Sequence, residues 1–151
     1  MTKTHNSENI SQTKKIAKNL AKKIISNSTK KQNKQAVVLA LYGNLGSGKT
    51  TFLQGFAKAL KIKEKITSPT FVILKRFPIF KFKNFYHIDC YRIENIEEII
   101  ELNFNNIISD PKNIVAIEWP EKIKKILPKN RINIKFSFIN KNKRKIVVKT
   151  R

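Results

Sequence analysis

The spacing of hydrophobic and polar residues predicts helices and strands in the first half of the chain. Apolar residues recur at helical spacing over residues 11–27, which predicts an amphipathic helix capped by Ser11 or Thr13. Residues 36–41 (AVVLAL) form a continuous apolar run, which is typical of a buried parallel strand. A glycine-containing loop follows this run, and residues 50–60 return to helical spacing. The first half therefore predicts a helix, then a strand–loop–helix unit.

The second half predicts shorter elements that end in a pair of strands. They are strands at 71–77 and 84–89, a helix at 95–102, a strand at 114–117, a helical turn at 121–127, and strands at 131–138 and 144–149. The last two strands alternate polar and apolar residues around a polar connection, so they are expected to form a β-hairpin. Residues 1–10 show neither pattern and are expected to be disordered.

These elements predict one α/β domain over residues 1–151, with a central mixed or parallel sheet, flanking helices and a C-terminal β-hairpin. The single cysteine, Cys90, excludes a disulfide framework. The longest apolar run spans residues 36–42, far short of the roughly 20 residues of a membrane span. The N-terminus has no hydrophobic signal core. A soluble, cytoplasmic protein with no membrane partner is expected.

The net charge of +22 changes the range of expected partners. It arises from 32 basic and 10 acidic residues, and residues 122–151 carry no acid at all. Such a balance favours a polyanionic partner such as RNA. The richness in Lys, Asn and Ile is equally the skew of an A+T-rich genome. Composition leaves both explanations open.

Residues 43–50 carry the chemistry that is easiest to recognise. GNLGSGKT matches the phosphate-binding loop pattern G-x-x-x-x-G-K-[ST], with a buried strand before it and a helix after it. Backbone N–H groups and the helix N-terminus would bind phosphate oxygens, Lys49 would reach the β- and γ-phosphates, and the Thr50 hydroxyl would bind Mg²⁺. The expected nucleotide-binding residues here are Gly43, Asn44, Leu45, Gly46, Ser47, Gly48, Lys49, Thr50 and Thr51.

A phosphate-loop enzyme also needs an acidic residue near the metal ion and a group that orients the attacking water. Asp89 and Glu118 each end a strand-like run, where a site at the carboxyl edge of a sheet would lie. Which of the two binds Mg²⁺ directly is left open. Residues 67–70 (TSPT) occupy the place of a segment that senses the γ-phosphate, through Ser68 or Thr70, and a plain turn fits these residues equally well. No N-K-x-D segment is present, which favours ATP over GTP.

Four segments together resemble the TsaE family, the small ATPases of bacterial tRNA threonylcarbamoyladenosine synthesis. They are GNLGSGKTTF, TSPTF, HIDCYR and IEWPE, in the family's order and spacing. The pairing of HxDxYR with EWPE after a buried strand is much more specific than the phosphate loop. The resemblance runs from about Ser11 to the C-terminus.

The resemblance implies a fold, an activity and partners. The fold is that of P-loop NTPases, and the activity is slow ATP hydrolysis that rises with the TsaB–TsaD complex, the threonylcarbamoyl transferase, whose repeated turnover TsaE supports. Contact with tRNA would come through that complex. The resemblance gives Asp89 the family's essential aspartate near Mg²⁺, Glu118 the catalytic or metal-associated glutamate, and Trp119 the adjacent tryptophan at the nucleotide.

The sequence departs from the family's pattern at three places. Ser47 replaces a frequent alanine, Asn44 replaces a common aspartate, and the stretch LNFNNIIS after Glu101 lacks a frequent glycine. Two other functions stay open on the residues alone. One is a small metabolite kinase, which would need an acceptor pocket and an arginine-bearing lid. The other is a basic RNA-binding module with a vestigial phosphate loop.

Overall fold

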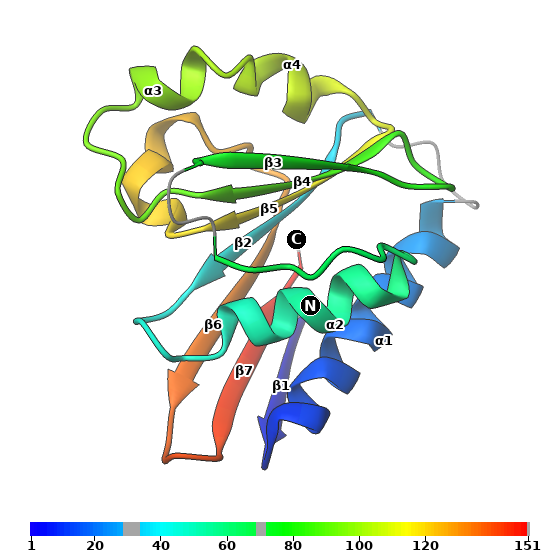
Figure 1. Ribbon diagram of the computed structural model, residues 1–151, viewed down its shortest axis with the longest axis vertical. Coiled ribbons are helices and arrows are strands. Elements are labelled where there is room, and N and C mark those ends of the chain that lie inside the picture. The colour runs from blue at the N-terminus through cyan, green and yellow to red at the C-terminus, as the bar shows by residue number, and fades with distance from the viewer. Residues whose placement is uncertain (29–33, 69–71, 151) are drawn as a thin grey trace.

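A seven-stranded sheet with the order β1-β7-β6-β2-β5-β4-β3 runs through the middle of the molecule (Figure 1). The computed structural model describes residues 1–28, 34–68 and 72–150. Along the chain the elements are β1 (Thr2–Ser7), α1 (Ile10–Ser28), β2 (Val37–Tyr42), α2 (Lys49–Ala59), β3 (Leu74–Pro78), β4 (Asn84–Asp89), α3 (Glu97–Ile100), α4 (Phe104–Ser109), β5 (Asn113–Glu118), the 3₁₀ helix η1 (Pro120–Ile126), β6 (Ile132–Phe138) and β7 (Arg144–Lys149).

The centre of the sheet is parallel and its edges are antiparallel. β2 pairs in parallel with β5 and β6, and β5 pairs in parallel with β4. β3 runs antiparallel to β4, and the hairpin of β6 and β7 extends the other side. This mixed sheet with flanking helices and a C-terminal hairpin confirms the predicted α/β P-loop fold. No helix within the described residues is long and apolar enough to cross a membrane.

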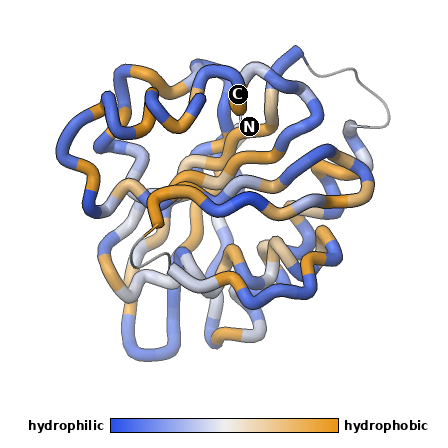
Figure 2. Tube along the Cα trace, turned by 45° about the horizontal axis from the view of Figure 1, so that its top comes forward, coloured by the Kyte–Doolittle hydropathy of each residue, from blue (hydrophilic) through white to orange (hydrophobic). Residues whose placement is uncertain are grey.

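The apolar strands bury side chains on both faces of the sheet, which explains their continuous hydrophobic runs. Leu39 and Leu41 of β2 face the cluster formed with α1 and α2, whereas Val38 faces the cluster formed with α3, α4 and η1. In Figure 1, α1 and α2 lie on one face of the sheet, and α3 and α4 lie on the other. Figure 2 shows hydrophobic residues concentrated along the central strands and hydrophilic residues along the outer loops.

The N-terminus corrects the expectation that residues 1–10 are disordered. Thr2–Ser7 forms β1, which pairs antiparallel with β7 from Thr2 opposite Lys149 to Ser7 opposite Arg144. The Met1 amino group also donates to the Thr150 carbonyl oxygen at 2.7 Å. Pairing satisfies the backbone groups that β7 would otherwise expose at the sheet edge. Most side chains of β1 remain exposed, so the segment carries no hydrophobic alternation.

The cap of α1 lies two to four residues before the position that was predicted. Asn9 accepts a hydrogen bond from the Gln12 backbone N–H at 2.9 Å, and the Gln12 side chain accepts from the Glu8 N–H at 2.8 Å. These bonds satisfy donors that the first helical turn leaves free. Thr13 is instead buried, with its hydroxyl 2.7 Å from the Ser7 hydroxyl.

The helix predicted at residues 95–102 is shorter, and a second helix follows it. α3 covers only Glu97–Ile100, and α4 begins after Asn103, whose φ of 58° lies in the left-handed region. Asparagine tolerates this conformation better than most residues, so Asn103 makes the turn without the missing glycine. The strand predicted at 71–77 begins at Leu74, and residue 71 lies outside the described residues.

The close approach of α1 to α2 generates a test of the packing. A Cβ atom on Gly55 would lie 2.6 Å from the Lys14 Cα and 2.5 Å from the Lys14 carbonyl oxygen. Both are backbone atoms of α1, so the helices must separate to admit a methyl group. We expect Gly55→Ala to lower the free energy of unfolding by about 1–3 kcal/mol, despite the higher helix propensity of alanine.

Urea denaturation measures this loss, with Lys58→Ala on the exposed face of the same helix as the matched control. The control should change the free energy of unfolding by no more than about 0.5 kcal/mol. A Gly55→Ala protein as stable as the control would contradict the packing described here.

Cys90 provides a second test, of the core between the sheet and α3. The side chain is fully buried, and this burial, aided by the charge of Asp89, raises the pKa of its thiol to about 12. Because the thiolate is the reactive form, we expect a disulfide reagent at pH 8 to modify the native protein about a thousandfold more slowly than the urea-unfolded protein. Equal rates in the two states would contradict this burial.

Candidate active site

The loop between β2 and α2 folds back over the sheet and is shaped by its glycines. Gly43 has a φ of 151°, and a Cβ there would lie 2.6 Å from the Ser47 hydroxyl oxygen and 2.9 Å from the Phe136 carbonyl oxygen. A larger residue would therefore push the loop away from β6. Gly48 has a φ of 101° and precedes the first residue of α2. These glycines allow the turn that points the loop backbone into a cleft.

The N-terminus of α2 opens into this cleft without a side-chain cap from any described residue. The backbone N–H groups of its first turn have no partner within the helix, and the helix dipole adds positive potential there. Thr50 and Thr51 belong to this turn and line the cleft. The arrangement is suited to binding an anion such as a phosphate group.

Lys49 crosses the mouth of the loop. Its ammonium group donates to the carbonyl oxygens of Gly43 and Asn44, the latter at 3.1 Å, and lies 4.4 Å from the centre of the Trp119 ring. Burial lowers the pKa of Lys49, and the carboxylates of Glu118 and Asp89 oppose this shift. The lysine is thus a buried cation held among carbonyl oxygens, an aromatic face and two nearby acids.

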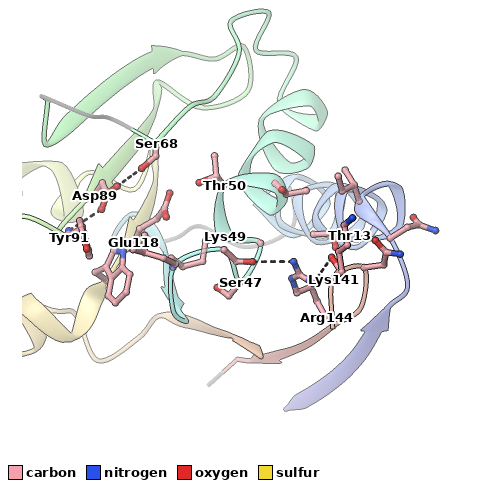
Figure 3. Close-up of a pocket in the computed structure, with 18 of the residues that line it drawn as sticks. Thr13, Ser47, Lys49, Thr50, Ser68, Asp89, Tyr91, Glu118, Lys141 and Arg144 are labelled. Atoms are coloured by element: carbon pink, nitrogen blue, oxygen red, sulfur yellow. Dashed lines mark hydrogen bonds between the residues drawn. The ribbon is translucent and has the colours of Figure 1, made fainter. Parts of the chain in front are cut away.

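Asp89 and Glu118 come together because their strands are parallel neighbours. Asp89 ends β4, Glu118 ends β5, and the two residues are register partners. Asp89 accepts hydrogen bonds from the Ser68 hydroxyl at 2.8 Å and from the Tyr91 backbone N–H at 3.0 Å (Figure 3). Two carboxylates at one sheet edge attract a cation, and Lys49 is already beside them.

His87 is a buried partner of Glu118, and the sequence assigned it no role beyond its place in the HIDCYR segment. Its Nε2 atom lies 2.8 Å from the Glu118 Oε1 atom, and both side chains are almost completely buried. A signal was present, because His87 precedes Asp89 by two residues and therefore shares its face of the sheet.

Trp119 reaches the cleft through an uncommon backbone conformation. Its φ of 55° lies in the left-handed region, which is costly for a bulky residue, and η1 begins at the next position. The indole ring packs against Tyr91 with their ring centres 5.1 Å apart and covers the Lys49 ammonium. The strain is therefore accompanied by contacts on the phosphate-loop lysine.

The cleft has a volume of about 590 Å³ and joins residues from both ends of the chain. Figure 3 shows Asp89 and Glu118 at one end, Lys141 and Arg144 at the other, and Lys49 between them. Arg144 donates to the Gly46 carbonyl oxygen at 3.1 Å. The cleft is lined by Asn9, Ile10, Ser11, Thr13, Leu45, Gly46, Ser47, Gly48, Lys49, Thr50, Thr51, Ser68, Asp89, Tyr91, Glu118, Trp119, Lys141, Asn142 and Arg144.

The predicted site residues that the structure describes therefore gather around one cavity. Gly43 and Asn44 contact Lys49, and the other predicted residues of the loop line the cleft. Thr70 lies outside the described residues. The sequence did not point to the wall formed by the start of α1 and the connection between β6 and β7. No local motif marks that wall, because it forms only when β1 and β7 pair.

The oxygen donors at the acidic end of the cleft suit Mg²⁺, which takes only a few of its ligands from the protein. They suit less well a metal ion that the protein coordinates entirely by itself. Among residues 1–28, 34–68 and 72–150, no group of three or more His, Cys, Asp or Glu side chains could hold a metal ion. Thr50, Asp89 and Glu118 line the same cleft and offer only oxygen atoms. Magnesium commonly binds to one or two carboxylates, with phosphate oxygens and water completing its octahedron.

Comparisons with known proteins identify the family of this chain. A family model described as "Threonylcarbamoyl adenosine biosynthesis protein TsaE" matches residues 7–146. The tRNA threonylcarbamoyladenosine biosynthesis protein TsaE of Rickettsia prowazekii is 39% identical over 132 residues, which cover 87% of this chain and 86% of that protein. Its counterpart in Borreliella burgdorferi is 43% identical over 95 residues, covering 63% of this chain and 68% of that protein.

The structure is also similar to a solved one. It superposes on the crystal structure of YdiB from Bacillus subtilis with a TM-score of 0.71 and 29% sequence identity, covering 99% of this chain and 86% of that chain. The match of the family model extends from the end of β1 into β7 and includes the loop, both acids and Trp119. The chain belongs to the TsaE family of threonylcarbamoyl adenosine biosynthesis proteins.

Proposed function

We propose that this protein binds and hydrolyses ATP with Mg²⁺, and so supports turnover of the TsaB–TsaD transferase complex in tRNA threonylcarbamoyladenosine synthesis. The observation that carries the proposal is the cleft in which Lys49, the uncapped N-terminus of α2 and the carboxylates of Asp89 and Glu118 face one space. An anion site beside an acidic site is what a metal–polyphosphate substrate requires.

The phosphate loop would bind the β- and γ-phosphates. The free N–H groups at the start of α2 and the loop backbone donate to phosphate oxygens. Lys49 exchanges its bonds to the carbonyl oxygens of Gly43 and Asn44 for bonds to the phosphates. The lysine is already positioned at the mouth of the loop, so little rearrangement is needed.

The nucleoside would occupy the opposite end of the cleft, between the start of α1 and the connection from β6 to β7. Asn9, Thr13 and Arg144 line this end and offer both donors and acceptors. The absence of an N-K-x-D segment from the sequence favours adenine over guanine. The volume of about 590 Å³ lies within the range of 300–1,000 Å³ that is usual for ligand sites.

Thr50 and one or both of Asp89 and Glu118 would hold Mg²⁺. When bound, the metal ion neutralises charge on the β- and γ-phosphates. Asp89 is held by Ser68 and the Tyr91 N–H, which keep its carboxylate turned toward the cleft. Ser68 belongs to the TSPT segment, so the γ-phosphate environment and this segment would be coupled through Asp89.

Glu118 would orient the attacking water and accept its proton. It is almost fully buried, borders the cleft, and has one carboxylate oxygen engaged by His87. Catalysis would depend mainly on positioning and on charge stabilisation by Lys49 and the backbone N–H groups. Membership of the TsaE family supports the TsaB–TsaD complex as the partner.

ATP hydrolysis by the purified protein, alone and with TsaB and TsaD, tests the proposal. We expect a low rate alone and a higher rate with the partners. Lys49→Ala should lower ATP affinity by about 10- to 100-fold, since a hydrogen bond to a charged group contributes about 1.5–3 kcal/mol, and should abolish turnover. Lys58→Ala, in the same helix but exposed, is the control.

Hydrolysis by Lys49→Ala at the wild-type rate would rule out the phosphate-loop assignment. ADP formation only with a particular small acceptor would favour a kinase instead. Tight, salt-dependent RNA binding without nucleotide affinity would favour a basic RNA-binding module.

Replacing Glu118 by glutamine separates hydrolysis from binding. Glu118→Gln keeps the volume and a polar atom near His87 but removes the base, so we expect kcat to fall by at least about 100-fold. The dissociation constant of ATP should change much less. Glu121→Gln, three residues further along and exposed, is the matched control. A Glu118→Gln protein that hydrolyses ATP normally would remove Glu118 from the proposed mechanism.

A further inference from the structure

The buried pair of His87 and Glu118 lies at the junction between the sheet core and the cleft. His87 is in the middle of β4, and its side chain is fully buried. Glu118 ends β5 and borders the cleft. We propose that His87 is a positioning residue that fixes one oxygen of the Glu118 carboxylate, so that the other serves the reaction. The inference rests on the proposed ATP hydrolysis and adds a residue to it.

Hydrogen bonding defines which atom of His87 acts on Glu118. The Nε2 atom is 2.8 Å from Oε1, whereas the buried Nδ1 atom has no partner among the described residues. An ionised carboxylate only accepts hydrogen bonds, so a ring nitrogen at this distance must carry the hydrogen. The Nε2–H group of His87 therefore donates to Oε1 of Glu118.

The remaining carboxylate oxygen of Glu118 is not engaged by any residue that the structure describes. Within the described part of the chain, Oε2 receives no hydrogen bond, although Glu118 lines the cavity. A carboxylate with one oxygen held by a rigid, buried ring has a defined orientation. Without this bond the side chain could rotate between the cleft and the interface of β4 and β5.

Neighbouring charges make this orientation necessary. Asp89 is the register partner of Glu118, so two carboxylates lie side by side at the sheet edge. Like charges at this separation repel each other unless separate donors hold them. Asp89 has Ser68 and the Tyr91 N–H, and Glu118 has His87. Each acid therefore has its own anchor, and each keeps its place in the cleft of Figure 3.

Packing alone does not explain a histidine at this position. The neighbours of His87 along β4 include Phe85 and Ile88, both fully buried, and an aliphatic side chain would fill the same space without burying polar nitrogen atoms. One of those nitrogen atoms, Nδ1, remains unsatisfied. The polar ring is accounted for by its bond to Glu118.

Two substitutions at His87 test the hydrogen bond. Glutamine places an amide N–H near the position of Nε2, whereas leucine fills the space without a donor. Outer partners of active-site groups typically contribute 10- to 100-fold in activity. We expect His87→Leu to lower kcat by about 10- to 100-fold, with less than about a threefold change in the dissociation constant of ATP.

The glutamine variant distinguishes positioning from packing. His87→Gln should recover a substantial part of the lost kcat, and His5→Gln, at the chain's other histidine in β1, should match the wild-type protein. An unchanged kcat in His87→Leu would overturn the inference. Equal losses in His87→Gln and His87→Leu at unchanged melting temperatures would also overturn it, because the ring itself would then be what matters.

A second measurement does not depend on activity or on a variant of His87. The chain has two histidines, so the ¹⁵N signals of their rings are readily assigned after a His5→Gln substitution. We expect His87 to show a protonated Nε2 atom, and the Nε2 signal to shift in Glu118→Gln. An unprotonated Nε2 atom in the wild-type protein would overturn the inference. Absence of ATP hydrolysis with intact His87 signals would instead count against the proposed function.

Discussion

The parallel pairing of β2, β5 and β4 is the constraint on which the site depends. Parallel strands end at the same edge of the sheet, so the phosphate loop after β2, Glu118 at the end of β5 and Asp89 at the end of β4 meet there. The register pairs Leu41 with Glu118 and Glu118 with Asp89. A slip by one residue would turn each of these side chains to the opposite face. The buried apolar runs of the strands oppose such a slip, because they pack specifically on both faces.

Packing on one face of the sheet then builds the rest of the cleft. α1 lies against α2, close enough that Gly55 leaves no room for a methyl group beside the Lys14 backbone. Asn9 caps α1 at the rim of the cleft, and Thr13 of its first turns lines the wall. The pairing of β1 with β7 holds this end of the helix beside the hairpin that carries Arg144. Residues more than a hundred positions apart thus form a single wall.

The sequence predicted those parts of the fold and the site that local patterns encode. The buried strands, the phosphate loop and the acids at strand ends follow from apolar runs and from residue types at fixed offsets. β4 and β7 begin and end at the predicted residues. β1 was missed because its exposed residues gain their partner only from β7. The break at Asn103 was missed because the stretch contains no glycine that would have marked it.

The same distinction separates the predicted site residues from those that were missed. Lys49 and Glu118 are marked by motif and by position at a strand end. Arg144 is not, because its contact with the Gly46 carbonyl oxygen joins two loops that only the folded sheet brings together. His87 is an intermediate case. Its spacing from Asp89 places it on the correct face, but its role depends on the register between β4 and β5, which no single segment encodes.

The charge of the cleft limits the ligands it can hold. The acidic end carries Asp89 and Glu118, while Lys141 and Arg144 lie at the other end, with Lys49 between them. A simple polyanion would be attracted to the basic end and repelled by the two carboxylates. A free cation would be attracted to the carboxylates and repelled by Lys49. A polyphosphate that brings its own divalent cation satisfies both ends at once, because its negative charge meets the lysine and its metal ion meets the acids. The anchoring of each carboxylate by separate donors keeps this separation of charge in place before the ligand arrives.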